Sequence, residues 1–173
     1  FLHMAINKRV LTILISVILI TVLFSACNSS NKKPIFPLDA DGKTNRNVVL
    51  INNTEYSITP RKDANGVDLD HGVTVRDFLE AKIDSETVTV VLPQISSVMT
   101  WRTDTDANIV KQEEKNAIGD REPAEGESGN IQIFTVKKPD GGKPLCFKFV
   151  NINDAEKPFD EVVAAREITI NIK

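Results

Sequence analysis

Residues 131–150 have the sequence IQIFTVKKPDGGKPLCFKFV. The first six and the last six of these residues are rich in β-branched and aromatic side chains, which is typical of β-strands. Between them, Pro139-Asp140-Gly141-Gly142 combines residue types that favour a turn. The stretch therefore predicts two consecutive strands joined by a short connection.

Further strands are predicted on both sides of this unit. The apolar runs share short length, β-branched residues and flanking turn residues, and they cover Val48–Ile51, Glu55–Ile58, Thr87–Leu92 and Glu167–Ile172. Asn52-Asn53 joins the first two in the manner of a tight hairpin. Several short strands with turns between them predict an all-β fold, an immunoglobulin-like antiparallel β-sandwich.

Two segments are harder to assign. Thr74–Lys82 fits a short helix capped by Thr74 or a bent edge strand, and we favour the strand. Lys111–Asn130 has no apolar period and carries many acidic residues and glycines. It is predicted to be a long loop, either a solvated excursion or a binding loop.

The N-terminal residues resemble an export signal. Lys8 and Arg9 precede an uncharged apolar run, Val10–Phe24, which is short for a membrane span. The run ends in Leu23-Phe24-Ser25-Ala26-Cys27, which resembles a lipobox, the site at which a bacterial lipoprotein is cleaved and acylated. Residues 1–26 are therefore predicted to be a signal peptide with a few upstream residues, and Cys27 the lipidated N-terminus. An ordinary signal peptide and an uncleaved anchor are the alternatives.

This N-terminal assignment divides the chain into three parts. Residues 27–47 are polar and rich in turn-forming residues, so they are predicted to be a flexible tether, and 48–173 the sandwich domain. We expect an exported, membrane-anchored lipoprotein, at the cell surface or in the periplasm, with a monomeric domain.

The composition argues against several classes of function. The net charge is −3 and the chain has one Trp and one Tyr, which disfavours nucleic-acid binding. The two cysteines are Cys27 and Cys146, and Cys146 fits a small buried residue of a strand.

Catalytic and metal-binding patterns are weak. Of the two histidines, His71 lies among turn-forming residues, so an enzyme built on it is the less favoured alternative. Residues 104–108 begin like a calcium loop, but Ile109 stands where glycine is needed and Lys115 where the bidentate glutamate belongs. We therefore predict no catalytic residue, no metal site and no cofactor.

One segment after Thr87–Leu92 carries a family resemblance. It reads Gln94-Ile95-Ser96-Ser97-Val98-Met99-Thr100-Trp101. It resembles the first inhibitory loop of the chagasin family of cysteine-peptidase inhibitors, in which two threonines, a glycine and an aromatic residue precede a tryptophan. Here Ser96 and Ser97 match the threonine pair and Trp101 the tryptophan. Val98 replaces the glycine of the family. Glycine can adopt a positive φ at little cost, and valine cannot.

Two later segments continue the resemblance in the same order. Residues 123–134 place Gly126 and Gly129 before a strand with Phe134, as in the family's second loop. Lys157-Pro158-Phe159 stands where the family has Arg-Pro-Trp. The resemblance covers 87–173.

The resemblance implies a membrane-tethered inhibitor whose three loops occlude the active-site cleft of a papain-like cysteine peptidase. The implied peptidase-binding residues are the matched ones, Ser96, Ser97, Val98, Trp101, Gly126, Gly129, Lys157, Pro158 and Phe159. The alternative is a non-inhibitory surface or periplasmic β-sandwich lipoprotein with an adhesive or structural role.

Overall fold

The computed structural model describes residues 33–60, 73–104, 108–119 and 129–173. Pro34–Lys173 form one compact unit. Its strands are β1 (Val48–Ile51), β2 (Thr54–Ser57), β3 (Val75–Ala81), β4 (Thr87–Gln94), β5 (Met99–Thr103), β6 (Ile109–Asn116), β7 (Asn130–Lys137), β8 (Leu145–Asn151) and β9 (Ala164–Ile172). Two short 3-10 turns, η1 (Asp140–Gly142) and η2 (Ile152–Asp154), flank β8.

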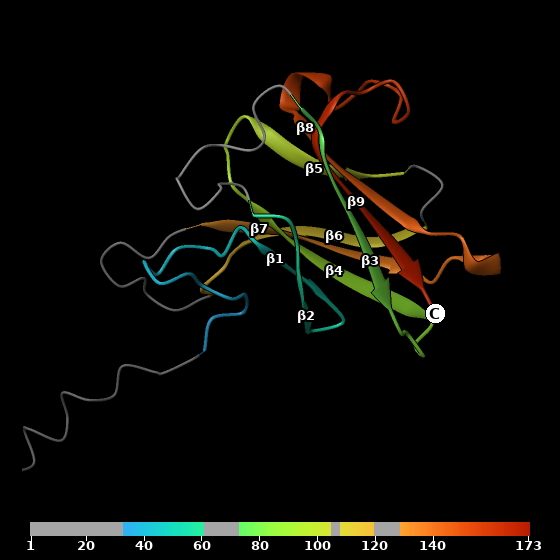
Figure 1. Cartoon of the computed structure of the whole chain (residues 1–173), viewed down its shortest axis with the longest axis horizontal. Helices are drawn as coiled ribbons and strands as arrows, with labels where there is room; N and C mark the ends of the chain where they lie inside the picture. Colours follow the sequence, from blue (N-terminus) through green and yellow to red (C-terminus); the bar gives the residue numbers. More distant parts are fainter. Residues whose placement is uncertain (1–32, 61–72, 105–107, 120–128) are drawn as a thin grey trace, which may run out of the picture. The chain divides into compact units, whose positions relative to one another are not determined.

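The strands form two sheets that lie face to face (Figure 1). One has the order β2-β1-β4-β7-β6 and the other β3-β9-β8-β5. All pairs are antiparallel except β3 with β9, which is parallel. The orders β4-β7-β6 and β9-β8-β5 match the B-E-D and G-F-C strands of an immunoglobulin sandwich. The predicted fold class is confirmed.

The local predictions for two short segments also hold. Asn52 and Asn53 have φ of 46° and 63°, the left-handed geometry that a two-residue hairpin requires. Thr74–Lys82 contains the strand β3, as we favoured, and no helix. Residues 139–144 turn the chain between β7 and β8, where Gly141 and Gly142 also have positive φ.

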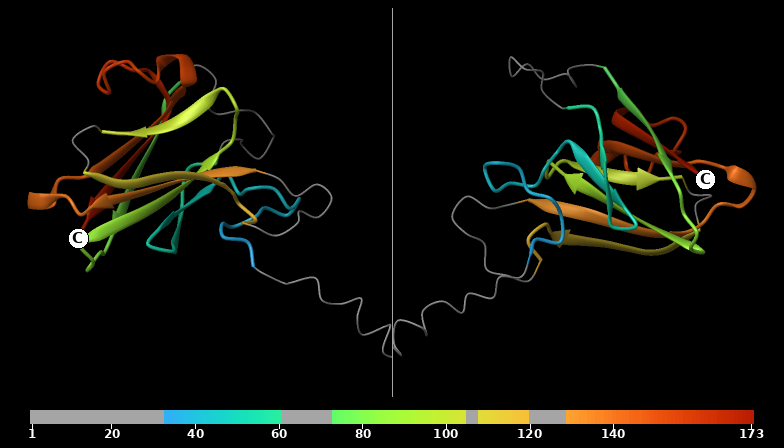
Figure 2. Two further views of the ribbon diagram at one scale, coloured as in Figure 1. Left: turned by 180° about the vertical axis from the view of Figure 1, so that it is seen from behind. Right: turned by 60° about the horizontal axis from the view of Figure 1, so that its bottom comes forward.

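The main core lies between the sheets and is built mainly from alternate residues of β1, β4, β7, β8 and β9, with Trp101 of β5 and Ala81 of β3. Phe134 of β7 meets Phe147 of β8 with ring centroids 5.3 Å apart. Trp101 of β5 packs on Phe149 of β8, with centroids 4.9 Å apart. Aromatic pairs at these distances stabilise the packing beyond the area they bury. The two views of Figure 2 show the layers that this core holds together.

The segment before β1 differs from its prediction. Residues 34–47, expected to belong to a flexible tether, fold against the outer face of the five-stranded sheet. Phe36 is 1% exposed and packs with Val48, Leu50, Val91 and Ile131. The backbone N–H groups of Ile35 and Phe36 both donate to the Ala117 carbonyl. The domain therefore begins at Pro34 rather than Val48, and every described hydrophobic cluster lies within Pro34–Lys173.

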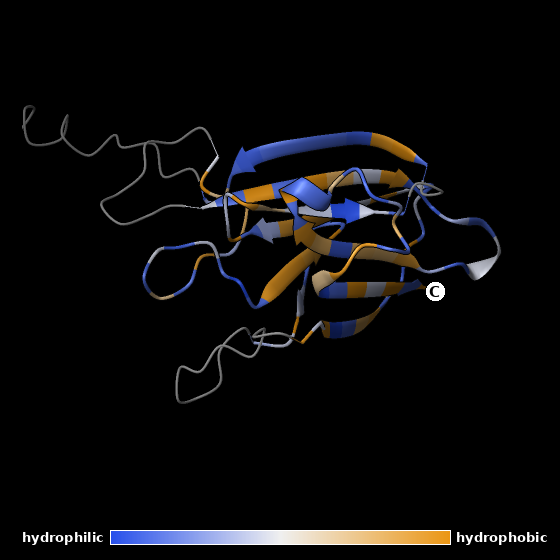
Figure 3. Cartoon of the chain, turned by 90° about the horizontal axis from the view of Figure 1, so that it is seen from above, coloured by the Kyte–Doolittle hydropathy of each residue, from blue (hydrophilic) through white to orange (hydrophobic). Residues whose placement is uncertain are grey.

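Strand β6 is a second difference. Residues 111–116, predicted to be part of a long loop, form an edge strand paired with β7. It is hydrophilic along most of its length (Figure 3) and exposed on both sides, so no apolar period marks it. Lys111 donates to Glu113 and lowers the pKa of that carboxyl below its ordinary value. Charged side chains of this kind protect a sheet edge from pairing with other chains.

Several predictions fall outside the described residues. These include the export signal, Cys27, His71 and Gly126. In the part of the chain that the structure describes, no helix has the length and apolar character needed to cross a membrane.

The burial of Phe36 generates a stability test on residues 34–173. Phe36→Ala removes a fully buried ring and should lower the free energy of unfolding by about 3–5 kcal/mol. Ile35→Ala, beside it and 45% exposed, should cost less than about 1.5 kcal/mol. Urea unfolding measures both. Equal losses for the two variants would show that the segment does not pack as described.

Candidate functional site

Three connections between strands leave the sandwich at one end. Gln94, the last residue of β4, pairs with Asn130, the first residue of β7, and Asn130 also pairs with Asn116 at the end of β6. In the other sheet, Met99 at the start of β5 pairs with Asn151 at the end of β8. We call this end the loop end. It carries the first connection (95–98), the described ends of the second (117–119 and Gly129) and the third (152–163).

The first connection is short and internally bonded. The Ser96 hydroxyl accepts a hydrogen bond from the Val98 backbone N–H at 3.3 Å. Among the described non-glycine residues, positive φ occurs at Asn52 and Asn53, so Val98 has an ordinary backbone conformation. The connection therefore needs no glycine at this position. Ser97 and Val98 are exposed, and Ser96 is half-buried.

The first and third connections touch each other directly. The Ile152 backbone N–H donates to the Val98 carbonyl at 3.0 Å. Ile152 opens the 3-10 turn η2, whose N-cap Asn151 accepts a hydrogen bond from the Asn153 N–H at 2.9 Å. This pairing fixes the two connections as one surface although they are about fifty residues apart in the sequence.

Trp101 lies beneath this surface and joins the two sheets. Its indole Nε1–H donates to the Pro93 carbonyl of β4 at 2.9 Å. Its backbone N–H donates to the Gln132 side chain of β7 at 2.7 Å, and the Gln132 amide donates to the Thr100 hydroxyl. Buried polar groups that are paired in this way fix a specific arrangement. Trp101 is thus a core residue of the sandwich, and its ring does not reach the surface.

Gly129 at the base of the second connection has a packing role. Its φ is +136°, and a Cβ placed there would lie 1.9 Å from the Thr44 hydroxyl oxygen. Thr44 belongs to the N-terminal segment, which crosses Gly129 closely. The Gly129 carbonyl accepts a hydrogen bond from Ala117 at 2.9 Å. Glycine is therefore required here for the second connection to meet residues 34–47.

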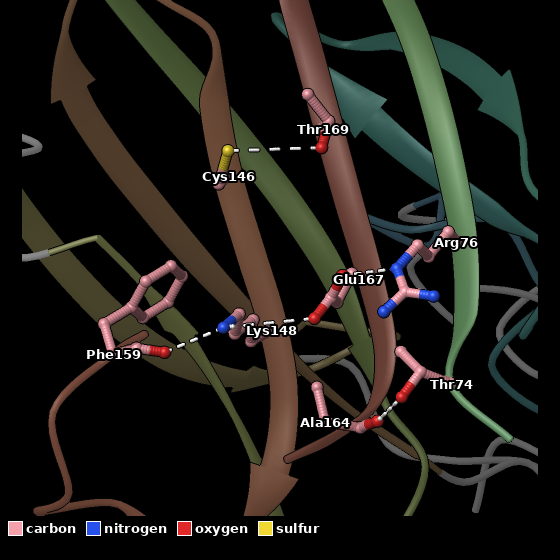
Figure 4. Close-up of polar contacts among 8 residues, drawn as sticks. All are labelled: Thr74, Arg76, Cys146, Lys148, Phe159, Ala164, Glu167 and Thr169. Atoms are coloured by element: carbon pink, nitrogen blue, oxygen red, sulfur yellow. Dashed lines mark hydrogen bonds and ion pairs between the residues drawn. The ribbon is translucent and has the colours of Figure 1, made fainter. Parts of the chain in front are cut away.

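The third connection folds back onto the outer face of the four-stranded sheet. The Phe159 ring lies 4.7 Å from the Lys148 ammonium, and the Phe159 carbonyl accepts from Lys148 at 2.8 Å (Figure 4). Arg102 donates to the Lys157 carbonyl at 2.8 Å. Phe159 is 8% exposed, so it anchors the connection to the sheet. Lys157 and Pro158 remain exposed.

The same outer face holds Cys146. The side chain is half-buried and lies 4.0 Å from the Thr169 hydroxyl (Figure 4). It points away from the core, although we predicted a buried residue. The sequence run alone could not show which face of the strand it occupies.

Exposed apolar side chains gather at the loop end. Val98 and Ile152 sit on the bonded first and third connections, and both are more than half exposed. Val73 and Val163 are also exposed, and they line an apolar depression of about 300 Å³ with Met99, Ala164 and Ala165. Exposed apolar groups clustered in one place are typical of protein-binding surfaces. Sequence reasoning missed Ile152 and Val163, since nothing in the local pattern shows that they face outward.

A polar depression of about 680 Å³ lies on the other side of the first connection. Its lining includes Lys43, Arg46, Gln94, Ser97, Glu114 and Asn130. Among the described residues, no group of histidine, cysteine, aspartate or glutamate side chains is placed to hold a metal ion.

Comparison with protein-family models, curated proteins and solved structures finds no match to this chain.

The contact between Gly129 and Thr44 generates a second prediction. Gly129→Ala should destabilise residues 34–173 by about 2–4 kcal/mol, since the new methyl group overlaps Thr44 in a strained backbone conformation. Adding Thr44→Gly should restore part of the loss. Gly141→Ala, at φ +68° with nothing within 4 Å, should cost only about 1–2 kcal/mol. Urea unfolding of these variants, of Thr44→Gly alone and of the unchanged protein checks this, and additive losses in the double variant would contradict the contact.

Proposed function

We propose that this protein inhibits papain-like cysteine peptidases by inserting the loop end into the active-site cleft. The observation that supports this most is the arrangement of the three connections that resemble the chagasin loops. The first and third leave one end of the sandwich and are hydrogen-bonded at Ile152 and Val98, and the described base of the second lies beside them. An inhibitor that inserts three loops into one cleft needs them to converge. We call the converging tips of the connections, Ser96–Val98 and Ile152 among the described residues, the wedge.

The tip of the wedge carries exposed apolar side chains beside two serine hydroxyl groups. Val98 is 58% exposed and Ile152 54%, and Ser96 and Ser97 directly precede Val98 in the chain. When a cleft covers apolar side chains that are exposed in the free protein, their removal from water stabilises the complex. Because the backbone of both connections is held by hydrogen bonds, little further ordering is needed on binding.

In this proposal the protein inhibits the peptidase by blocking its active-site cleft. The first connection lies across the catalytic cysteine without presenting a peptide bond in attack geometry, so the peptidase does not cleave it. The hydrogen bonds that Val98 forms with Ser96 and with Ile152 favour such resistance to cleavage. Trp101, Gly129 and Phe159 support the wedge from inside or from the sheet face, and they do not serve as contact residues.

A second candidate is a binding module that does not inhibit a peptidase. The burial of Phe159 favours it, because the corresponding family residue is an interface anchor and this ring already packs on Lys148. In that case the same apolar loop end would bind a surface partner in adhesion or in envelope structure.

We also propose that the domain is exported and held at a membrane by lipid on Cys27. The support is the sequence of the first 27 residues, a basic start, an apolar run and small residues before the cysteine. More than one acyl chain gives stable anchoring. Such anchoring would confine inhibition to the cell surface or the periplasm.

The inhibitor proposal is tested by titrating papain with residues 34–173. Inhibition is expected, and Val98→Asp should weaken it at least tenfold, because the variant places an unpaired carboxylate in the covered surface. The control is Val110→Asp. Val110 is 57% exposed and lies near the other end of the sandwich, on β6, so its inhibition constant should be unchanged.

Two outcomes would contradict the proposal. Absence of inhibition of papain and of several cathepsin-type peptidases would favour the non-inhibitory binding module. Equal weakening by Val98→Asp and Val110→Asp would show that the loop end is not the contact surface.

The anchor is tested in bacterial cells with Cys27→Ser. The variant loses the acylated thiol, so the protein should leave the membrane fraction for the soluble one, measured by fractionation and immunoblot. Cys146→Ser is the control and should stay membrane-bound. Retention of Cys27→Ser in the membrane would instead indicate an uncleaved anchor.

A further inference from the structure

Strand β3 lies at the edge of the four-stranded sheet, and no described strand pairs with its other side. In its parallel pairing with β9, the Ala81 carbonyl accepts from the Lys173 N–H. Backbone groups alternate in direction along a strand. The N–H and C=O groups of Arg76, Phe78 and Glu80 therefore point away from β9, and no described residue forms a backbone hydrogen bond with them.

The side chains at these positions lie on the outer face. Phe78 is 71% exposed, whereas the other aromatic side chains in the described residues are buried or half-buried. Arg76 contacts Glu167 at 2.9 Å, and Glu80 contacts Lys173 at 2.5 Å (Figure 4 shows the first pair). The Arg76, Glu80 and Lys173 side chains are exposed and that of Glu167 is half-buried. The Arg76 guanidinium has further N–H groups to donate.

The other three sheet edges lack this combination. β2 has only four residues. The edge of β5 is occupied at Trp101 by the Gln132 side chain. β6 carries no aromatic side chain that could form the centre of a contact between two copies.

The edge of β3 is complementary to itself. Antiparallel pairing of two copies centred on Phe78 places Phe78 opposite the partner's Phe78. Arg76 then faces the partner's Glu80, and Glu80 faces the partner's Arg76. The free backbone groups of all three residues point into the junction, as the hydrogen-bonded positions of an antiparallel pair require. A two-fold interface needs this kind of match.

We propose that the protein forms a two-fold symmetric dimer through β3, which joins the four-stranded sheets of two copies edge to edge. This proposal differs from the expectation of a monomeric domain. The stacked Phe78 rings form the centre of the contact, and two Arg76–Glu80 pairs flank it. The interface uses none of the residues of the wedge, so this inference does not depend on the inhibitor proposal.

The register is tested by disulfide trapping in residues 34–173 carrying Cys146→Ser. Hydrogen-bonded antiparallel partners have Cα atoms about 5.5 Å apart, within the range that a disulfide spans. Phe78→Cys should therefore cross-link into a covalent dimer under mild oxidation. Arg76→Cys is the matched control on the same edge, and its two copies would lie about 14 Å apart, so it should stay monomeric.

The two cysteine variants separate the outcomes. The proposal is supported if Phe78→Cys cross-links and Arg76→Cys does not. It is also supported if the double variant Arg76→Cys, Glu80→Cys cross-links although Arg76→Cys by itself does not. Equal cross-linking of both single variants, or of neither, overturns it.

A charge exchange tests the same interface without cysteine. In sedimentation over a range of concentrations, Arg76→Glu should raise the dimer dissociation constant at least tenfold, because it places two like-charged pairs across the junction. The double variant Arg76→Glu, Glu80→Arg should restore dimerisation. A domain that stays monomeric at all concentrations, or a double variant that remains as weak as the single one, contradicts the proposal. Unfolding curves of each variant check that the fold is kept.

Discussion

The junction of Trp101 with Gln132 is the interaction on which the loop end depends. Gln132 belongs to one sheet, and it accepts the backbone N–H of Trp101 in the other. The Trp101 ring in turn donates to Pro93, just before the first connection. An unpaired buried amide or indole N–H would be costly, so these bonds hold the two sheets in one relative position at this end. Because the connections begin and end on these strands, their positions are held as well.

Around this junction the aromatic residues and the exposed apolar residues have separate roles. Trp101 and Phe159 are buried and support the connections, whereas Val98 and Ile152 are exposed on them. The N-terminal segment adds support from another side through Phe36 and Thr44. In our proposal the peptidase meets only the exposed set. The β3 edge lies along the side of the sandwich, which would leave the wedge accessible in a dimer.

The sequence predicted the parts of the fold that have a strong local pattern. Strands β4, β7, β8 and β9 carry β-branched and aromatic runs, and Asn52-Asn53 is a hairpin signal. It failed for β6, whose residues are polar on both faces, and for Phe36, a single aromatic residue in a polar segment. The family resemblance implies that the first and third connections converge, and in the structure the Ile152 N–H donates to the Val98 carbonyl. The sequence could not show that Trp101 lies in the core, that Phe159 packs on the outer face of the four-stranded sheet, or that Gly129 leaves room for Thr44. Each of these depends on a contact with another strand or segment.

The central claim, that the loop end is the surface that meets a peptidase, is tested most directly by mapping the contact. Residues 34–173 labelled with ¹⁵N would be titrated with papain whose catalytic cysteine is blocked. The account predicts that amide signals of Ser96–Val98 and Ile152–Asn153 shift or broaden first, while those of Ile109–Lys111 stay unchanged. Perturbations confined to the other end of the sandwich, or to a sheet face, would contradict it.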